Sequence, residues 1–148
     1  MKTYTVEVHD NGDKFWYLNG KLHREDGPAC DYIYGDKCWY LNGKLHREDG
    51  PAVELANGEK FWYMNDKLHR EDGPAAEYVN GDKLWYLNDK VHREDGPAAE
   101  YIDGRKGWYL NGNKHTESEF NAKTNFLKEL SVADVEKILG YKVKIVKD

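Results

Sequence analysis

The sequence predicts a mainly β protein, an elongated single-sheet array of β-hairpin repeats with a small α/β cap at its C-terminal end. Tryptophan recurs with a 23-residue period, hairpin turn signals recur between the tryptophans, and both patterns end near residue 115. A fixed period of this length is typical of stacked repeat proteins. We therefore divide the chain into a five-unit array with an N-terminal strand over residues 1–115 and a cap over residues 116–148. The tryptophans are Trp16, Trp39, Trp62, Trp85 and Trp108.

Each unit is predicted to contain two strands and two tight turns. Residues 3–8 alternate between apolar and polar side chains, which predicts a half-buried strand before the first unit. Residues 14–18 run back after a turn, and Asn19-Gly20 is a strong hairpin signal because a type I′ turn needs positive φ at both central residues. The same order recurs with strands at 75–79 and 83–87.

A crossing segment of seven residues, His-Arg-Glu-Asp-Gly-Pro-Ala, links the units and occurs intact four times. It contains every proline of the chain, and the Asp-Gly before each proline predicts a turn whose carboxylate accepts local backbone N–H groups. We interpret these segments as structural joints, in which arginine meets a carboxylate of the next unit and histidine donates to a backbone carbonyl. The alternative is a His/carboxylate row that binds a divalent metal or a small ligand. The joint residues singled out are His23, Asp26, His46, Asp49, His69, Asp72, His92 and Asp95.

The tail after the last unit predicts helix, helix and strand. Thr116 and Glu119 have the spacing of a capping box, which predicts a helix start. Ser131 is a weaker second start signal, and residues 141–146 alternate like a final strand. Such a tail would cover the open end of the sheet.

Composition limits the partners. The net charge is −5, and because the tail has six Lys against six Asp and Glu, the acidity belongs to the array. This argues against nucleic acid and favours a basic protein surface. The chain is 39% hydrophobic but 14% aromatic, so we expect rings to supply most of the buried surface. No membrane span or signal peptide is visible, which predicts a cytoplasmic protein without membrane insertion. Cys30 and Cys38 are interpreted as small apolar fillers.

Two aromatic rows should lie on opposite faces, because neighbouring strand residues point to opposite sides. We expect the Trp row to be core and the Tyr row to be a protein-contact surface. Residues that break the repeat, Asp31, Tyr34 and Arg105, are further contact candidates, since a specific partner must recognise something that is not repeated. The Tyr row consists of Tyr17, Tyr40, Tyr63, Tyr86 and Tyr109.

The unit resembles the MORN repeat, a family of β-hairpin units built around Tyr or Trp, Asn-Gly-Lys, His and Asn-Gly-Asp. Residues 42–46 (Asn-Gly-Lys-Leu-His) and 78–83 (Tyr-Val-Asn-Gly-Asp-Lys) carry the resemblance, which extends over residues 11–115. The His-Arg-Glu-Asp-Gly-Pro-Ala variant resembles sequences in bacteriophage and large-virus proteins. The resemblance implies a non-enzymatic scaffold that contacts other proteins, with a host defence factor as one target and the host cytoplasm as its location.

The residues themselves also indicate binding rather than catalysis. A catalytic group is needed once per site, whereas the charged motif occurs four times, and no lone Ser or Cys sits beside a lone His. We therefore predict no enzyme activity and no cofactor. The leading hypothesis is a repeat scaffold that binds another protein, and open sheet edges would also allow two copies to pair.

Overall fold

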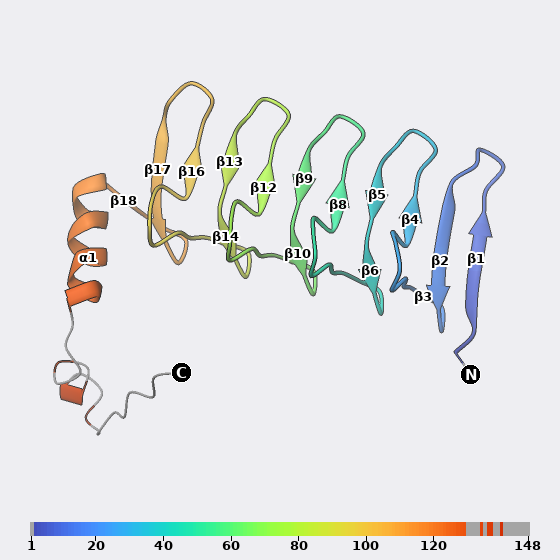
Figure 1. Ribbon diagram of the computed structural model, residues 1–148, viewed down its shortest axis with the longest axis horizontal. Helices are drawn as coiled ribbons and strands as arrows, with labels where there is room; N and C mark the ends of the chain where they lie inside the picture. The colour runs from blue at the N-terminus through green and yellow to red at the C-terminus, as the bar shows by residue number, and fades with distance from the viewer. Residues whose placement is uncertain (1, 130–133, 135, 138–139, 141–148) are drawn as a thin grey trace.

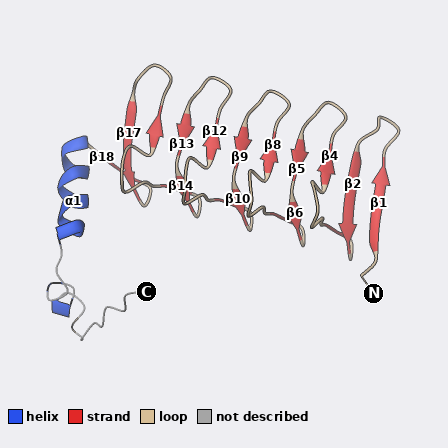
Figure 2. Ribbon diagram, viewed as in Figure 1, coloured by secondary structure: helices blue, strands red, loops and turns tan. Residues whose placement is uncertain are grey.

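A computed structural model confirms the mainly β fold, an array of antiparallel hairpins followed by a helix (Figures 1 and 2). The structure describes residues 2–129, 134, 136–137 and 140. The hairpins stand side by side from the N-terminal end to the helix, so the molecule is an elongated ribbon (Figure 1).

The strands of the first two units and of the N-terminal edge are β1 (Tyr4–Val8), β2 (Lys14–Leu18), β3 (Lys21–Leu22), β4 (Cys30–Asp31), β5 (Lys37–Cys38), β6 (Tyr40–Leu41) and β7 (Lys44–Leu45). The next strands are β8 (Val53–Glu54), β9 (Lys60–Phe61), β10 (Tyr63–Met64), β11 (Lys67–Leu68), β12 (Ala76–Glu77), β13 (Lys83–Leu84), β14 (Tyr86–Leu87) and β15 (Lys90–Val91). The last elements are β16 (Ala99–Glu100), β17 (Lys106–Leu110), β18 (Asn113–His115) and helix α1 (Glu117–Glu129).

The predicted single sheet is divided along its length. A 12-stranded sheet runs in the order β1-β2-β4-β5-β8-β9-β12-β13-β16-β17-β18, with β3 paired to β2. The hairpins β6–β7, β10–β11 and β14–β15 form separate two-stranded sheets. The division falls at the tryptophan of each middle unit. The N–H of Trp39 bonds Ala52 at the end of the following joint, whereas the carbonyl of Tyr40 accepts from Arg24 of the preceding joint. Trp39 and Tyr40 are adjacent in sequence, but one bonds the following joint and the other the preceding joint. This change of partner separates β5 from β6.

The turns at the lower edge of the ribbon in Figure 1, such as those between β6 and β7 and between β10 and β11, have the predicted type I′ character. Asn42 and Gly43 have φ of 52° and 80°, and Asn65 and Asp66 have 51° and 67°. A non-glycine residue at positive φ is strained. At Asp66 the side chain offsets this, because its carboxylate accepts from the N–H of Leu45 in the preceding unit at 2.8 Å.

The turns at the upper edge of the ribbon, such as those between β1 and β2, β4 and β5, and β12 and β13, also hold the units in register. The carboxylates of Asp13, Asp36 and Asp82 accept from backbone N–H groups 20 residues later, at 2.9, 2.7 and 2.8 Å. Each bond joins the turn of one hairpin to the turn of the next, so both edges of the ribbon are tied between units.

The most completely buried side chains of the array are those of alanines. The expectation that rings supply most of the buried surface stays a prediction. The alanine that ends each joint is completely inaccessible, while the tryptophans and the Tyr row are half-buried. The alanines with no exposed surface are Ala29, Ala52, Ala75, Ala76, Ala98 and Ala99.

The first strand also differs from its prediction. β1 pairs with β2 over its whole length, but all of its residues are exposed rather than half-buried. Tyr4, Val6 and Val8 keep 42, 48 and 63% of their surface accessible. As the edge strand, β1 has a neighbour on one side only.

The helix that follows the array starts as predicted. The N–H of Thr116 donates to the Glu119 carboxylate at 2.8 Å, and the N–H of Glu119 donates back to the Thr116 hydroxyl at 3.2 Å, which is a capping box. Phe120 is 2% exposed and its ring lies 4.9 Å from that of Trp108. The predicted second helix start at Ser131 and the strand at 141–146 lie outside the described residues.

The alanine core gives the first testable prediction. Ala52→Leu places three extra carbon atoms where no surface is accessible, so we expect a loss of about 1–3 kcal/mol in the free energy of unfolding measured in urea. Ala56→Leu, at an exposed turn position, is the matched control and should change stability by less than about 0.5 kcal/mol. Equal effects at the two positions would contradict the packing described above.

Candidate functional site: the joint groove

The four joints, residues 23–29, 46–52, 69–75 and 92–98, share one arrangement that the sequence alone does not reveal. In each, the arginine guanidinium lies over the indole of the tryptophan eight residues earlier. Such a cation–π contact is worth about 0.5–2 kcal/mol, more as it is desolvated. The arginine side chains here are 21–25% exposed. The pairs, with the distance from Cζ to the ring centre, are Arg24–Trp16 at 4.1 Å, Arg47–Trp39 at 4.0 Å, Arg70–Trp62 at 4.1 Å and Arg93–Trp85 at 4.2 Å.

The other face of each guanidinium lies against the glycine of the same joint. A Cβ added at Gly73 would come within 2.8 Å of the Arg70 Cζ, and one at Gly50 within 2.9 Å of the Arg47 Cζ. Neither glycine has positive φ. Glycine is therefore needed here for close approach, not for backbone conformation, and the guanidinium is sandwiched between an indole and a glycine.

The edge of each guanidinium is held by oxygen atoms. Arg47 donates from Nε to Asp49 at 2.8 Å and from Nη1 to the Pro51 carbonyl at 3.2 Å and Glu54 at 3.0 Å. The contact with Glu54 reaches the strand after the joint, as predicted. The carboxylate of Asp49 also forms a hydrogen bond with its own backbone, the local contact predicted, but its main partner is the arginine two residues earlier. This bond lowers the pKa of Asp49.

The first joint and the last unit depart from this arrangement around the arginine. At the first joint Asp31 stands where the others have Glu54, Glu77 or Glu100, and its side chain is one methylene shorter. In the last unit Thr116 replaces the arginine, and the ring of Phe120 from α1 covers Trp108 instead. The helix therefore substitutes for the missing guanidinium.

The joint histidines accept hydrogen bonds from the backbone instead of donating to a carbonyl. The Nδ1 atoms of His46, His69 and His92 accept from the N–H of an asparagine in the next unit at 3.3, 3.2 and 2.9 Å. This fixes the proton on Nε2, which lies 3.4–3.6 Å from the glutamate two residues later. The prediction was wrong because the lower turn of the next unit presents an N–H, and not a carbonyl, to each ring.

This geometry counts against the metal alternative. A metal on Nε2 would require the proton to move to Nδ1, where it would meet the backbone N–H. Within the described part of the chain, no group of three or more His, Cys, Asp or Glu side chains could hold a metal ion.

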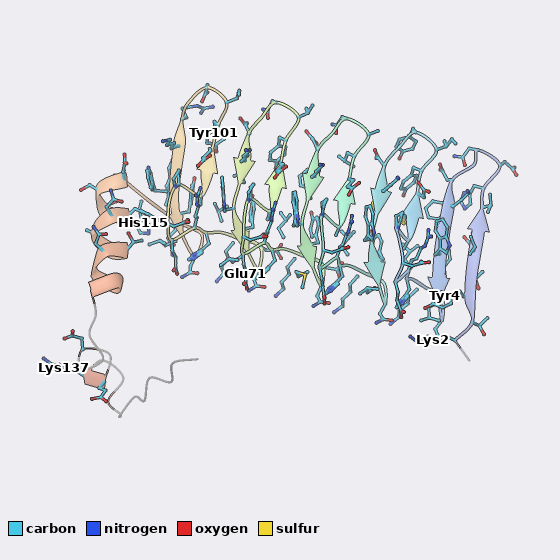
Figure 3. The ribbon with its side chains drawn as sticks, viewed as in Figure 1. Lys2, Tyr4, Glu71, Tyr101, His115 and Lys137 are labelled. Atoms are coloured by element: carbon cyan, nitrogen blue, oxygen red, sulfur yellow. The ribbon has the colours of Figure 1, made fainter. Side chains whose placement is uncertain are left out.

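Successive joints line a row of open hollows that we call the joint groove. Three equivalent hollows of about 550, 730 and 690 Å³ are centred on Trp39, Trp62 and Trp85. Each is floored by the indole and by Leu41, Met64 or Leu87, and is walled by the charged residues of the two joints beside it. Figure 3 shows side chains crowded along this lower part of the ribbon, with Glu71 labelled among them.

The rim of the groove is acidic and accessible. The side chains of Glu48, Glu71 and Glu94 are 82, 85 and 71% exposed, and each lies beside a histidine. The aspartates next to them are also exposed but hold the arginines. The glutamates are therefore the carboxylates best placed to meet an incoming cation.

The Tyr row does not stand out as the wetter face. Its members are half-buried, like the tryptophans. Burial raises the pKa of Tyr40 to about 12 and also raises the pKa values of Tyr63 and Tyr86. Its role as a contact surface stays a prediction.

The residues that break the repeat are not brought together. Asp31 ends β4, Tyr34 lies in the β4–β5 turn with 61% of its surface exposed, and Arg105 lies in the β16–β17 turn, paired with Asp103 at 2.7 Å. The turns of Tyr34 and Arg105 are separated by two whole hairpins (Figure 1).

The cysteines face each other across neighbouring strands. Cys30 of β4 is in register with Cys38 of β5, and both are free thiols. Burial raises the pKa of Cys30 to about 12 and raises that of Cys38. Neither is a ready nucleophile, since the thiolate is the reactive form.

No protein-family model matches this chain, and comparison with curated proteins finds none similar to it. The resemblance to MORN repeats therefore stays a prediction. Among the described residues, no helix is long and apolar enough to span a membrane.

The sandwich predicts a non-additive pair of substitutions. Gly73→Ala places a methyl group against the Arg70 guanidinium, so we expect the free energy of unfolding to fall by about 1–3 kcal/mol. In an Arg70→Ala background the same change should cost much less, because the group it displaces is gone. Urea unfolding of the four proteins measures the coupling, and purely additive losses would contradict the sandwich.

Proposed function

We propose that this chain is a non-enzymatic repeat scaffold that binds another protein through the joint groove. The observation that carries the proposal is the row of three equivalent hollows, each combining a half-buried indole with exposed carboxylates. Half-buried aromatic rings near an accessible charged rim are typical of protein interfaces.

The repetition supports binding over catalysis. The arginine, the aspartate and one histidine nitrogen of each joint are engaged in contacts that hold successive units together. Four joints with the same contacts present the same chemistry several times, which suits a surface that contacts its partner at several points. The acidic rim favours a basic partner surface.

We further propose that the chain acts in the cytoplasm of a bacterial host and that its partner is a host defence factor. The resemblance of the joint motif to bacteriophage sequences supports this choice. The facing free thiols of Cys30 and Cys38 suit a reducing compartment.

A comparative pull-down tests the proposal. Tagged wild-type protein should retain a defined host protein, and the groove variant Glu48→Gln/Glu71→Gln/Glu94→Gln should lose most of it, because three rim charges are removed without touching the arginine contacts. Quantitative mass spectrometry of the captured proteins measures the difference.

A second triple variant is the control. Glu7→Gln/Asp10→Asn/Asp103→Asn also removes three exposed charges, but away from the groove, and should capture the partner like wild type. Capture of nothing above background, or equal loss with both variants, would overturn the proposal.

A further inference from the structure

The spacing of the groove limits which partner segment can use all of its hollows. Successive units each add two strands to the main sheet, such as β8 with β9 and then β12 with β13. Neighbouring strands lie about 4.8 Å apart, so equivalent hollows recur about every 9.6 Å. A segment that lies along the groove must therefore repeat its own contacts about every 9.6 Å.

We infer that the joint groove binds a polyproline II segment with a basic residue at every third position. A polyproline II helix has three residues per turn and rises about 3.1 Å per residue, so every third side chain points the same way about 9.3 Å further on. An extended β-strand does not fit, because every third residue falls on the opposite side.

An α-helix fits less well than polyproline II. Positions seven residues apart lie on one face, about 10.5 Å from each other at 1.5 Å per residue. Against the spacing of about 9.6 Å given by two strands, this error accumulates to roughly 1.8 Å over the two intervals between three hollows. The corresponding error for polyproline II is about 0.6 Å.

The chemistry of each hollow matches the same segment. Each hollow is lined by an indole, which carries the arginine of its own joint over one face, and by Leu41, Met64 or Leu87. Aromatic-lined grooves bind proline rings in known polyproline II recognition. The rim provides two glutamates at each hollow, and those between neighbouring hollows are shared, so basic side chains spaced like the hollows can each meet a carboxylate. The glutamates are Glu25, Glu48, Glu71 and Glu94.

The hydrogen-bonding needs of the groove walls and of a polyproline II backbone are also compatible. Among the described residues no buried side-chain polar atom lacks a partner, so the groove walls do not require a ligand backbone to satisfy them. A polyproline II backbone is solvated and makes no internal hydrogen bonds, so it loses none on docking. The basic side chains then supply the specificity, one per hollow.

This inference rests on the proposed use of the groove and is tested with peptides on the full chain. Fluorescence anisotropy compares two labelled peptides of the same composition. One has arginine at every third position among prolines, and the other has the same arginines at irregular spacings. We expect the regular peptide to bind at least about tenfold more tightly, because only it can engage successive hollows together.

The groove variant Glu48→Gln/Glu71→Gln/Glu94→Gln should remove that advantage, while Glu7→Gln/Asp10→Asn/Asp103→Asn should keep it. An equal melting temperature for the variants and wild type shows that each is folded. Equal affinity for the two peptides, no binding of either, or tighter binding of a helical peptide with arginine every seventh residue would overturn the inference.

The two proposals can fail separately. If capture of the host protein depends on the rim glutamates but the peptides show no preference for regular spacing, the scaffold role stands and the polyproline II assignment is wrong. If neither capture nor peptide binding depends on those glutamates, both proposals are wrong.

Discussion

A guanidinium held between an indole and a glycine links each of the first four units to the unit that follows it. Arg47 shows the whole arrangement, with Trp39 on one face, Gly50 on the other, and hydrogen bonds to Asp49, the Pro51 carbonyl and Glu54. This one side chain joins a strand, the joint that follows it and the next strand. Because the chain turns around a charged group, the ribbon has no need of a thick apolar core.

Stability therefore comes from contacts between neighbours, as in other repeat proteins. Alanines such as Ala52 allow the close approach of hairpins, and the turn carboxylates of Asp36 and Asp66 tie each unit to the adjacent one. The same design leaves the tryptophans half-buried with carboxylates around them. The groove proposed to bind a partner is thus a direct consequence of how the units are joined.

The sequence predicts much of this fold but little of the site. The period, the Asn-Gly turns and the Thr116–Glu119 capping box depend on local chemistry, and the structure contains all three. The arginine sandwich was missed because strand alternation assigned the tryptophans to an apolar core. One signal could have revealed it. Arginine follows tryptophan by eight residues in four units, and it is absent in the fifth, where Phe120 covers Trp108.

A nuclear Overhauser spectrum of the isotope-labelled chain tests directly whether each joint arginine lies on its tryptophan. We predict cross-peaks from the side-chain protons of each joint arginine to the indole protons of its own tryptophan, such as Arg70 to Trp62. Arg105 is an internal control, because it lies over Tyr101 and should show no contact with any indole. Joint arginines without indole cross-peaks would show that the guanidinium groups do not pack on the indoles.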